Sequence, residues 1–323
     1  LDVGPGDTVW TSPNTFVASA NCARYCGAAV DFVDIDPHTW CMSVESLRHK
    51  LANAKKARAI LPKVVIPVHF AGQSCDMEAI AKLATEYGFR IIEDASHAIG
   101  GAYKDEPVGN CRYSDITVFS FHAVKIITTG EGGMALTNSA EIAERMERLR
   151  AHGITRDPDK LTHPPDGPWY YEQIELGFNY RMTDIQAALG LSQLERLDSY
   201  IERRNTLARR YDHALRDLPL QLPTVQVENR SAFHVYVVRL KPSATDKAHR
   251  RVFESLRQRS IGVNLHYMPV HLQPYYRGLG FAPGQYPEAE AHGKEAITLP
   301  MYSALTDQQQ DQVVDSLQRV LRC

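Results

Sequence analysis

The sequence predicts an α/β protein with a largely parallel sheet. From residue 9 to about 140, short apolar runs alternate with segments of helical periodicity, which is typical of parallel sheets covered by helices on both faces. The 323 residues suffice for a sizeable core and for two domains. Beyond about residue 200 the pattern of elements changes. We therefore expect a large domain over 1–200 and a smaller C-terminal α+β domain over 201–323.

The first elements follow from apolar spacing and from glycine positions. A helix is expected in "TFVASANCARYCG" up to Gly27, followed by strands in "AAVDFVDID" and "VVIPVHF". The next helix, 76–88, places apolar side chains on one face and ends at Gly88, a typical helix C-terminus. Its apolar positions are Met77, Ile80, Leu83, Ala84 and Tyr87.

Three more strands are expected in "RIIEDASHA", "SDITVFSFH" and "GGMALTN", and a helix over about 141–151. The segment 152–177 then reads as a long loop rich in Pro, Asp and Gly. Loops of this length inside compact domains are usually functional or mobile.

The residues that follow the loop predict one long helix over 183–215. Thr183 and Gln186 form a capping box at its start. Its expected apolar stripe consists of Ile185, Leu189, Leu194, Leu197 and Ile201. After it we expect a strand over 233–240, a helix over 246–262, a strand over 263–267 ("VNLHY"), and a last helix capped by Thr306 and Gln309.

Composition argues against several classes of partner. The 36 Lys+Arg nearly balance 38 Asp+Glu, so neither nucleic acid nor a membrane surface is indicated, and no apolar run approaches the roughly 20 residues that span a bilayer. The six cysteines are scattered without a CxxC pair, which favours reduced thiols in a cytoplasmic protein over disulfides. His266 and His271 lack the carboxylates of a zinc site, so we expect no metal.

The chain opens with "LDVGPGD" and has no initiator methionine. Because "GDTVWTSP" reads like the middle of a domain, we expect that a preceding segment has been removed or left out.

Polar residues that follow the predicted strands are the candidate site, because ligands of open α/β sheets bind beyond the C-terminal strand ends. Asp94 ends one strand and His97 follows it; Ser120 ends another and Lys125 follows. Asp94 alone could be a helix N-cap, and Lys125 alone a surface charge. Together they match pyridoxal phosphate, which needs an amine, an acidic partner for its ring nitrogen, and hydroxyls for its phosphate.

Other phosphate-binding motifs fit less well. "GPGD" lacks the preceding strand and third glycine of a dinucleotide fold. "TTGEGG" lacks the lysine and hydroxyl of a P-loop and is interpreted as a tight turn.

Motifs along essentially the whole chain resemble the DegT/StrS family of pyridoxal-phosphate-dependent sugar-nucleotide aminotransferases. They are "SPNTFVAS", "VDID", "EDASHAIG", "FSFHAVKIITTGEGG" and "GFNYRMTDIQAALGLSQLERLD". The resemblance implies the fold-type I aminotransferase architecture and a homodimer with active sites at its interface. It also implies an N-terminal Gly-Thr pair that helps to hold the cofactor phosphate, and this chain starts after that point.

The same resemblance implies roles for individual residues. Lys125 resembles the Schiff-base lysine, and Asp94 resembles the partner of the pyridine nitrogen. The other cofactor-binding positions are His97 beside the ring hydroxyl, Ser120 at the phosphate, Phe16 stacked on the ring, and Asn179 reaching the phosphate in the partner subunit's site.

Within the family, "HGITRDP" and "HYMPVHLQPYYRGLGF" resemble most the transaminases of pseudaminic acid biosynthesis. This implies L-glutamate as amino donor and the 4-keto carbon of a UDP-linked 6-deoxy-N-acetylamino sugar as acceptor. Candidate walls of the sugar site are Trp169, Tyr170, Tyr171, His234, His266 and Tyr267, although aromatic residues there serve equally well as core or interface.

Two other classes stay open. One is an aminotransferase for another nucleotide keto-sugar, such as a perosamine-like one, or an enzyme with other chemistry on this fold. Dehydratase relatives carry histidine in place of the Schiff-base lysine, so the presence of Lys125 argues against a dehydratase. The other is a non-catalytic regulatory protein or fragment that keeps the fold.

Overall fold

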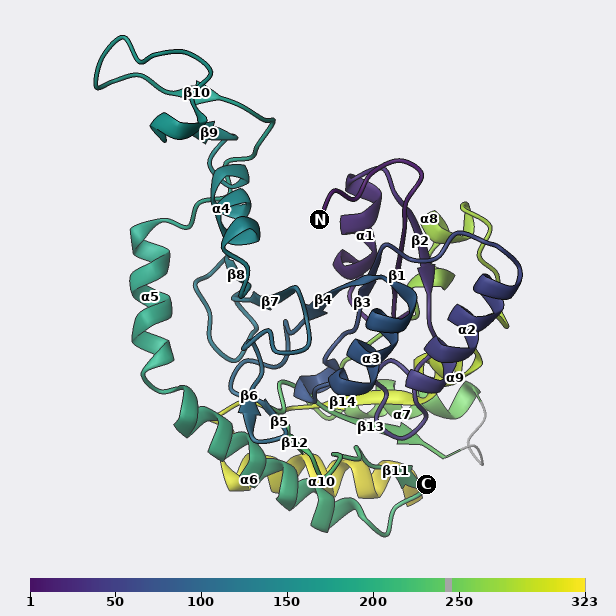
Figure 1. Cartoon of the computed structure of the whole chain (residues 1–323). Coiled ribbons are helices and arrows are strands. Elements are labelled where there is room, and N and C mark those ends of the chain that lie inside the picture. The colour runs from purple at the N-terminus through teal and green to yellow at the C-terminus, as the bar shows by residue number, and fades with distance from the viewer. Residues whose placement is uncertain (242–245, 323) are drawn as a thin grey trace.

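A computed structural model describes residues 1–241 and 246–322. Its centre is a six-stranded sheet of order β2-β1-β3-β4-β7-β8 (Figure 1). The strands are β1 (Thr8–Thr11), β2 (Ala29–Phe32), β3 (Val64–Ile66), β4 (Arg90–Asp94), β7 (Ile116–Ser120) and β8 (Gly133–Leu136). The first five are parallel and β8 is antiparallel to β7. The predicted α/β class with a mostly parallel sheet is confirmed.

The centre of this sheet is covered on both faces, as expected for parallel strands. Val9, Trp10 and Thr11 of β1 are all buried, and so is the whole of β3. The edge differs, because Gly133, Met134 and Ala135 of β8 are exposed. The expectation of cover on both faces is therefore wrong at this antiparallel edge.

Four helices accompany the sheet: α1 (Ala18–Tyr25), α2 (Val44–Lys56), α3 (Met77–Tyr87) and α4 (Ala140–Leu149). The side chains of Ser43, Asp76 and Ser139 accept hydrogen bonds from the first turns of α2, α3 and α4. Gly88 ends α3 with φ 79°, the left-handed conformation that the sequence predicts there. Helix α2 was not anticipated from the sequence.

The helix expected over 183–215 is two helices, α5 (Asp184–Leu194) and α6 (Leu197–Leu215). The predicted capping box of Thr183 and Gln186 is present. The chain bends at Arg196, whose φ and ψ of −105° and 3° are not helical, and α6 turns away from α5 (Figure 1). The predicted apolar stripe divides accordingly: Ile201 is buried, whereas Ile185, Leu189 and Leu194 on α5 are exposed.

The C-terminal part contains a three-stranded antiparallel sheet of β11 (Leu220–Gln221), β13 (Tyr236–Leu240) and β14 (Ala296–Leu299). Helices α6, α7 (Asp246–Gln258) and α10 (Asp307–Arg322) accompany it, and Thr306 and Gln309 cap α10 as predicted. The strand predicted over 263–267 is wrong, since only Asn264 makes a bridge, to Thr298. Other short elements are β5 (Ala102–Tyr103), β6 (Glu106–Pro107), β12 (Asn229–Arg230), α8 (Pro274–Arg277) and α9 (Pro287–Glu295).

The main core beneath the large sheet includes side chains from the C-terminal part of the chain. Val237, Val270, Tyr276 and Tyr286 pack in one cluster with Val9, Phe32 and their neighbours. A second core, made by α6, α7, α10 and the small sheet, is separate. The division into domains at residue 200 stays a prediction.

The loop predicted over 152–177 extends away from the sheet beyond α4 (Figure 1). It contains the short pair β9 (Ile154–Thr155) and β10 (Glu172–Gln173). Of the helices in the described ranges, none combines the length and apolar character that crossing a membrane requires.

Candidate active site

The predicted site residues Asp94 and Ser120 end two neighbouring parallel strands, β4 and β7, where Asp94 pairs with Val118. Because parallel strands present their carboxyl ends at one edge, this pairing brings Asp94 and the loop after Ser120 together. The strand before them in the sheet, β3, leads at the same edge into His69 and Phe70.

The Asp94 carboxylate is held from two sides. Its Oδ2 accepts a 2.5 Å hydrogen bond from the Ser19 hydroxyl on α1, and its Oδ1 accepts one of 3.1 Å from the Ser96 backbone N–H. Since the only proton of Ser19 goes to Asp94, the Thr15 hydroxyl at 2.7 Å donates to Ser19. The Thr15–Ser19–Asp94 chain fixes the orientation of the carboxylate. Ser19 was missed in the sequence, where only its position in the first turn of a helix after the first strand could have pointed to it.

Lys125 lies in the loop that connects β7 to β8. The loop closes on itself through hydrogen bonds from Thr129 N–H to Phe121 O and from Lys125 N–H to His122 O, both 2.9 Å. Gly130, with φ 77°, makes the turn that "TTGEGG" predicts. Burial lowers the pKa of the Lys125 amine, and the nearby Asp94 charge opposes that shift. Within the described ranges, no hydrogen bond or ion pair engages this amine, so it is available for chemistry.

His97 lies in a cluster of aromatic rings near Lys125. Its ring centroid is 4.4 Å from that of His234 and 6.4 Å from that of His266. Burial is the main cause that keeps the pKa of His97 well below its ordinary value, and the positive charge of Lys125 acts in the same direction. Burial and the charge of Lys125 also lower the pKa of His234, and lower that of His266 to about 4. These imidazoles are therefore neutral at neutral pH.

A segment from the last quarter of the chain, residues 266–270, completes this cluster. The Tyr267 backbone N–H donates to Asn14 Oδ1 at 3.2 Å, and Val270 N–H donates to Pro13 O at 2.9 Å. The Tyr267 hydroxyl lies 3.0 Å from Nε2 of His97. The sequence named His266 and Tyr267 only as possible walls of a sugar site, because a contact across 170 residues has no local signal.

Arg204 of α6 binds the backbone of the segment that leads into β13 and contains His234. One of its guanidinium nitrogens donates to the carbonyls of Phe233, His234 and Met301 at 3.0 to 3.1 Å. Burial lowers the pKa of Arg204 to about 10. No carboxylate pairs with it in the described part of the chain, so three carbonyl dipoles stabilise its charge.

Behind Asp94, Glu93 points into the core on the opposite face of β4. It accepts hydrogen bonds from His69 Nε2 at 2.7 Å, from Thr117 Oγ1 at 3.0 Å, and from Ser114 Oγ. Burial opposes ionisation, but these bonds prevail and hold the pKa of Glu93 below its ordinary value. This buried network fixes the strand on which Asp94 lies.

The other predicted site residues are placed as follows. Phe16 is 62 % exposed and lies three residues before Ser19, so its ring is largely uncovered. The Ser120 hydroxyl is half-buried and accepts a 3.4 Å hydrogen bond from the His122 N–H. Asn179 is not joined to this cluster: it is exposed and makes a bridge to Ala151 after α4.

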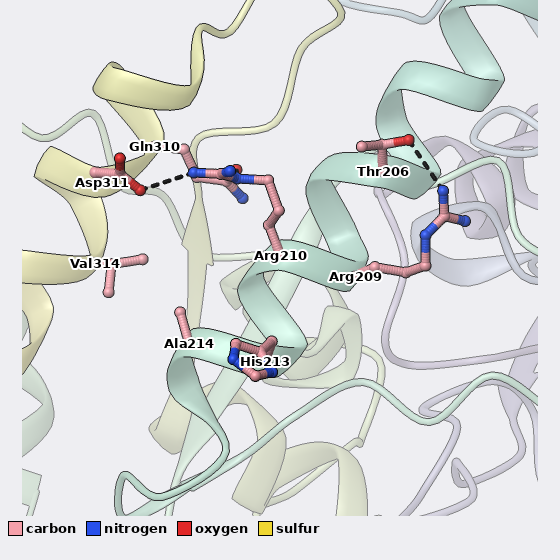
Figure 2. A pocket seen from close by; sticks show the side chains of 8 residues that line it. All are labelled: Thr206, Arg209, Arg210, His213, Ala214, Gln310, Asp311 and Val314. Atoms are coloured by element: carbon pink, nitrogen blue, oxygen red, sulfur yellow. Dashed lines mark hydrogen bonds and ion pairs between the residues drawn. The ribbon is translucent and has the colours of Figure 1, made fainter.

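A hollow of about 430 Å³ lies elsewhere, between α6 and α10 (Figure 2). Its cations are already engaged, since Arg210 donates to Asp311 at 2.8 Å and to Gln310 at 2.9 Å, and Arg209 donates to Thr206 at 3.0 Å. Among the residues that the structure describes, no group of histidine, cysteine and acidic side chains has the arrangement of a metal site.

The residues around Lys125 fit pyridoxal phosphate. A partly buried amine without a hydrogen-bond partner in the described residues lies within the field of an oriented carboxylate, the Ser120 hydroxyl ends the strand before it, and the exposed Phe16 ring lies three residues before the Ser19 that binds the carboxylate. Comparison with protein families agrees, because residues 1–318 match the DegT/DnrJ/EryC1/StrS aminotransferase family. The chain belongs to this family. It is thus an aminotransferase that depends on pyridoxal phosphate, as predicted.

Individual relatives support the assignment. The aminotransferase is 36 % identical over 99 % of its length to the spore coat polysaccharide biosynthesis protein SpsC of Bacillus subtilis, of which it covers 80 %. The putative sugar aminotransferase Spr1654 of Streptococcus pneumoniae, solved in a PMP form, superposes with a TM-score of 0.88 at 30 % identity, over 99 % of this chain and 83 % of that one. PseC of Helicobacter pylori, involved in pseudoaminic acid biosynthesis, gives 0.87 at 28 % identity over 98 % and 80 %.

Proposed function

We propose that this aminotransferase transfers the amino group of L-glutamate to the 4-keto carbon of a UDP-linked 6-deoxy-N-acetylamino sugar, as in pseudaminic acid biosynthesis. The observation that carries the proposal is the Lys125 amine, partly buried, unengaged and within the field of the Asp94 carboxylate. The likeness to PseC and to a polysaccharide biosynthesis protein supports the class of acceptor.

In this proposal Lys125 holds the cofactor and then moves protons. Its lowered pKa leaves a larger unprotonated fraction near neutral pH, and only the unprotonated amine is a nucleophile or a base. With the cofactor bound, the free Lys125 amine would take the proton from the donor's α-carbon, and in the second half of the reaction it would deliver a proton to the sugar carbon.

Asp94 would serve both halves of the reaction by holding a proton on the ring nitrogen of the bound cofactor. When bound, pyridoxal phosphate supplies an electron sink for the carbon that loses its proton, and a protonated ring nitrogen is needed for that. The Ser19 and Ser96 hydrogen bonds leave Asp94 few ways to rotate out of this role. Ser120 would bind the phosphate, Phe16 would stack on the ring, and His97 would lie beside the ring hydroxyl.

We also propose that the enzyme is a homodimer in which Asn179 reaches the partner's site. The apolar side chains of α5 support this, because Ile185 is 85 % exposed and Leu191 65 % exposed. Replacing Leu191 with Asp is expected to halve the molar mass in sedimentation and to lower cofactor affinity. Val227→Asp, at a position that is 95 % exposed elsewhere on the surface, should do neither. A wild-type monomer would contradict the dimer.

The test of the function is a glutamate-dependent assay against a panel of UDP- and dTDP-linked 4-keto sugars. We expect turnover with the UDP-linked 6-deoxy-N-acetylamino sugar in the presence of L-glutamate. Turnover confined to another keto-sugar would favour the alternative substrate, a perosamine-like precursor for example.

Absorbance separates the enzyme from a non-catalytic protein of the same fold. The holoprotein should be yellow, glutamate should bleach it, and borohydride should fix the cofactor to the peptide that contains Lys125. A colourless protein that binds no pyridoxal phosphate would favour a regulatory role.

A further inference from the structure

We propose that Tyr267 is a positioning residue for His97: its hydroxyl donates to Nε2 of His97 and thereby holds the proton of the neutral imidazole on Nδ1. The tautomer itself is independent of the reaction, and only its effect on the cofactor rests on the proposed function.

The contact between the two side chains is well defined. The Tyr267 hydroxyl lies 3.0 Å from Nε2, and the two rings are within 25° of parallel with centroids 6.1 Å apart. His97 is 5 % exposed, so water cannot replace this partner at low cost.

Both groups are uncharged near neutral pH. Burial, and then the charge of Asp94, raises the pKa of Tyr267 well above its ordinary value, and burial lowers that of His97. Tyr267 therefore does not release its proton to His97. The pair is a hydrogen bond between a phenol and a neutral imidazole, and its direction decides the tautomer.

The count of unsatisfied groups favours donation by tyrosine. If His97 donated through Nε2, the phenol proton would need another acceptor, and no other partner of that hydroxyl exists in the described residues. The Nδ1 of His97 would also remain a buried lone pair without a donor. Donation by Tyr267 leaves a single unpaired group, the Nδ1–H of His97.

The ring next to that N–H group is His234, and it does not bind it. The His234 ring lies 4.4 Å from His97 between centroids, and its own Nδ1 is buried without a partner in the described residues. No hydrogen bond joins the two rings in the described residues, so Tyr267 is the one described hydrogen-bond partner of the His97 imidazole.

The tyrosine is itself held firmly enough to impose this order. Its backbone N–H is bound by Asn14, and the adjacent His266 is fixed by Thr298 Oγ1 at its Nδ1 and by His292 Nε2 at its carbonyl, both at 2.8 Å. The hydroxyl therefore comes to His97 from a fixed direction, and the imidazole keeps one orientation beside Lys125 and Asp94.

The direct test is the tautomer of His97 in the full-length protein without cofactor, labelled with ¹⁵N-histidine. Long-range proton–nitrogen spectra, with His97 assigned from the His97→Gln spectrum, should show the proton on Nδ1. In Tyr267→Phe the signal should move toward a mixture of both tautomers. A proton on Nε2 in the wild type, or an unchanged spectrum in Tyr267→Phe, would overturn the proposal.

A second readout is the affinity for pyridoxal 5′-phosphate, measured by absorbance titration. Tyr267→Phe should raise the dissociation constant about fivefold, the factor that the loss of one hydrogen bond brings. Tyr275→Phe is the matched control, because the Tyr275 hydroxyl contacts only Arg24, at 3.4 Å, among the described residues. In a His97→Phe background, Tyr267→Phe should have no further effect; an equal effect in both backgrounds would show that Tyr267 does not act through His97.

The two measurements separate this inference from the proposed function. If the enzyme failed to transaminate any sugar of the panel, the tautomer of His97 would still be tested by its spectrum. If the spectrum showed the proton of His97 on Nε2 while turnover was normal, only the proposed role of Tyr267 would be contradicted.

Discussion

At the scale of single residues, the site depends on two groups of opposite charge, of which one is fixed by hydrogen bonds and the other is not. The Asp94 carboxylate is fixed by Ser19 and Ser96, whereas the Lys125 amine has no fixed partner in the described residues. A group that must bind, release and carry protons needs freedom to move, and a group that holds one proton in place does not.

Removing either group is expected to stop or slow the reaction. Lys125→Ala should abolish glutamate-dependent turnover. Asp94→Ala should lower kcat by about 10²- to 10⁴-fold, an effect comparable to the loss of a positioned acid or base, because the ring nitrogen of the cofactor would lose the partner that keeps it protonated. Asp217→Ala, whose side chain is 91 % exposed, serves as the control and should keep wild-type kcat. A near-normal rate in Asp94→Ala would remove Asp94 from its assigned role.

The electrostatic link between the two groups can be measured without any substrate. The Asp94 charge raises the pKa of Lys125 against the effect of burial, so Asp94→Asn should lower that pKa further. The rate of Lys125 acetylation, followed by mass spectrometry across pH in the apoprotein, should therefore reach its half-maximum at a lower pH in the variant. A shift to higher pH would contradict the placement of Asp94 beside Lys125.

At the scale of elements, the close contact between the loop after β3 and the segment that enters β13 sets the position of His234. The Ala232 N–H donates to Gly72 O at 2.9 Å, and the His234 N–H donates to Ala71 O at 2.8 Å, so the entry to β13 is bound to the loop after β3. Gly72 has φ 110°, and a Cβ atom there would lie 2.6 Å from the Phe233 nitrogen.

Gly72→Ala is therefore expected to be severely destabilising. Backbone strain and the clash with Phe233 should lower the free energy of unfolding by about 2 to 4 kcal/mol in chemical denaturation. Gly262→Ala should change it by less than about 0.5 kcal/mol, because a Cβ atom there meets nothing within 4 Å. Equal stability of the two variants would mean that the contact around Gly72 is looser than described.

The elements also show what could be predicted from the sequence. The strands that contain Asp94 and Ser120, and the caps at Thr183 and Thr306, follow from local patterns and are where they were expected. The bend at Arg196 could not be predicted, because helix-forming residues run through it without glycine or proline. Residues 263–267 have the alternation of a strand, but they are fixed by Asn14, Thr298 and His292 instead of a ladder.

The same distinction holds for the site. Asp94 ends β4, and His97 and Lys125 lie in the loops after β4 and β7, so order along the chain predicts their proximity. Ser19 and Tyr267 meet them only through tertiary packing, across 75 and 170 residues.

At the scale of the whole molecule, several histidines are buried in the neutral state. Burial lowers the pKa of His292 to about 3, and burial with the charge of Lys125 lowers that of His266 to about 4. His97 and His234 are shifted in the same direction. In the unfolded chain these groups take up protons near pH 6.5.

The protein should therefore lose stability as the pH falls from about 6.5 toward 4, because the unfolded chain binds more protons in this range. Each such histidine contributes about 1.4 kcal/mol per pH unit. Urea denaturation at pH 7.5 and pH 5 measures the difference in the free energy of unfolding between the two pH values. This difference should be smaller in His292→Gln. Equal free energies at both pH values would contradict the neutral burial of these rings.

The contact of Tyr267 with Asn14 has a consequence for folding of the chain during its synthesis. The two residues are separated by 253 positions. At synthesis rates of about 5–20 residues per second, Tyr267 therefore emerges about 13 to 50 s after Asn14. In the later part of that interval, once Lys125 has emerged, the strand ends around Asp94 and Lys125 are complete but lack one wall. A nascent chain halted before residue 267 would present an unfinished pocket, and capture of the cofactor would be among the last events of its maturation.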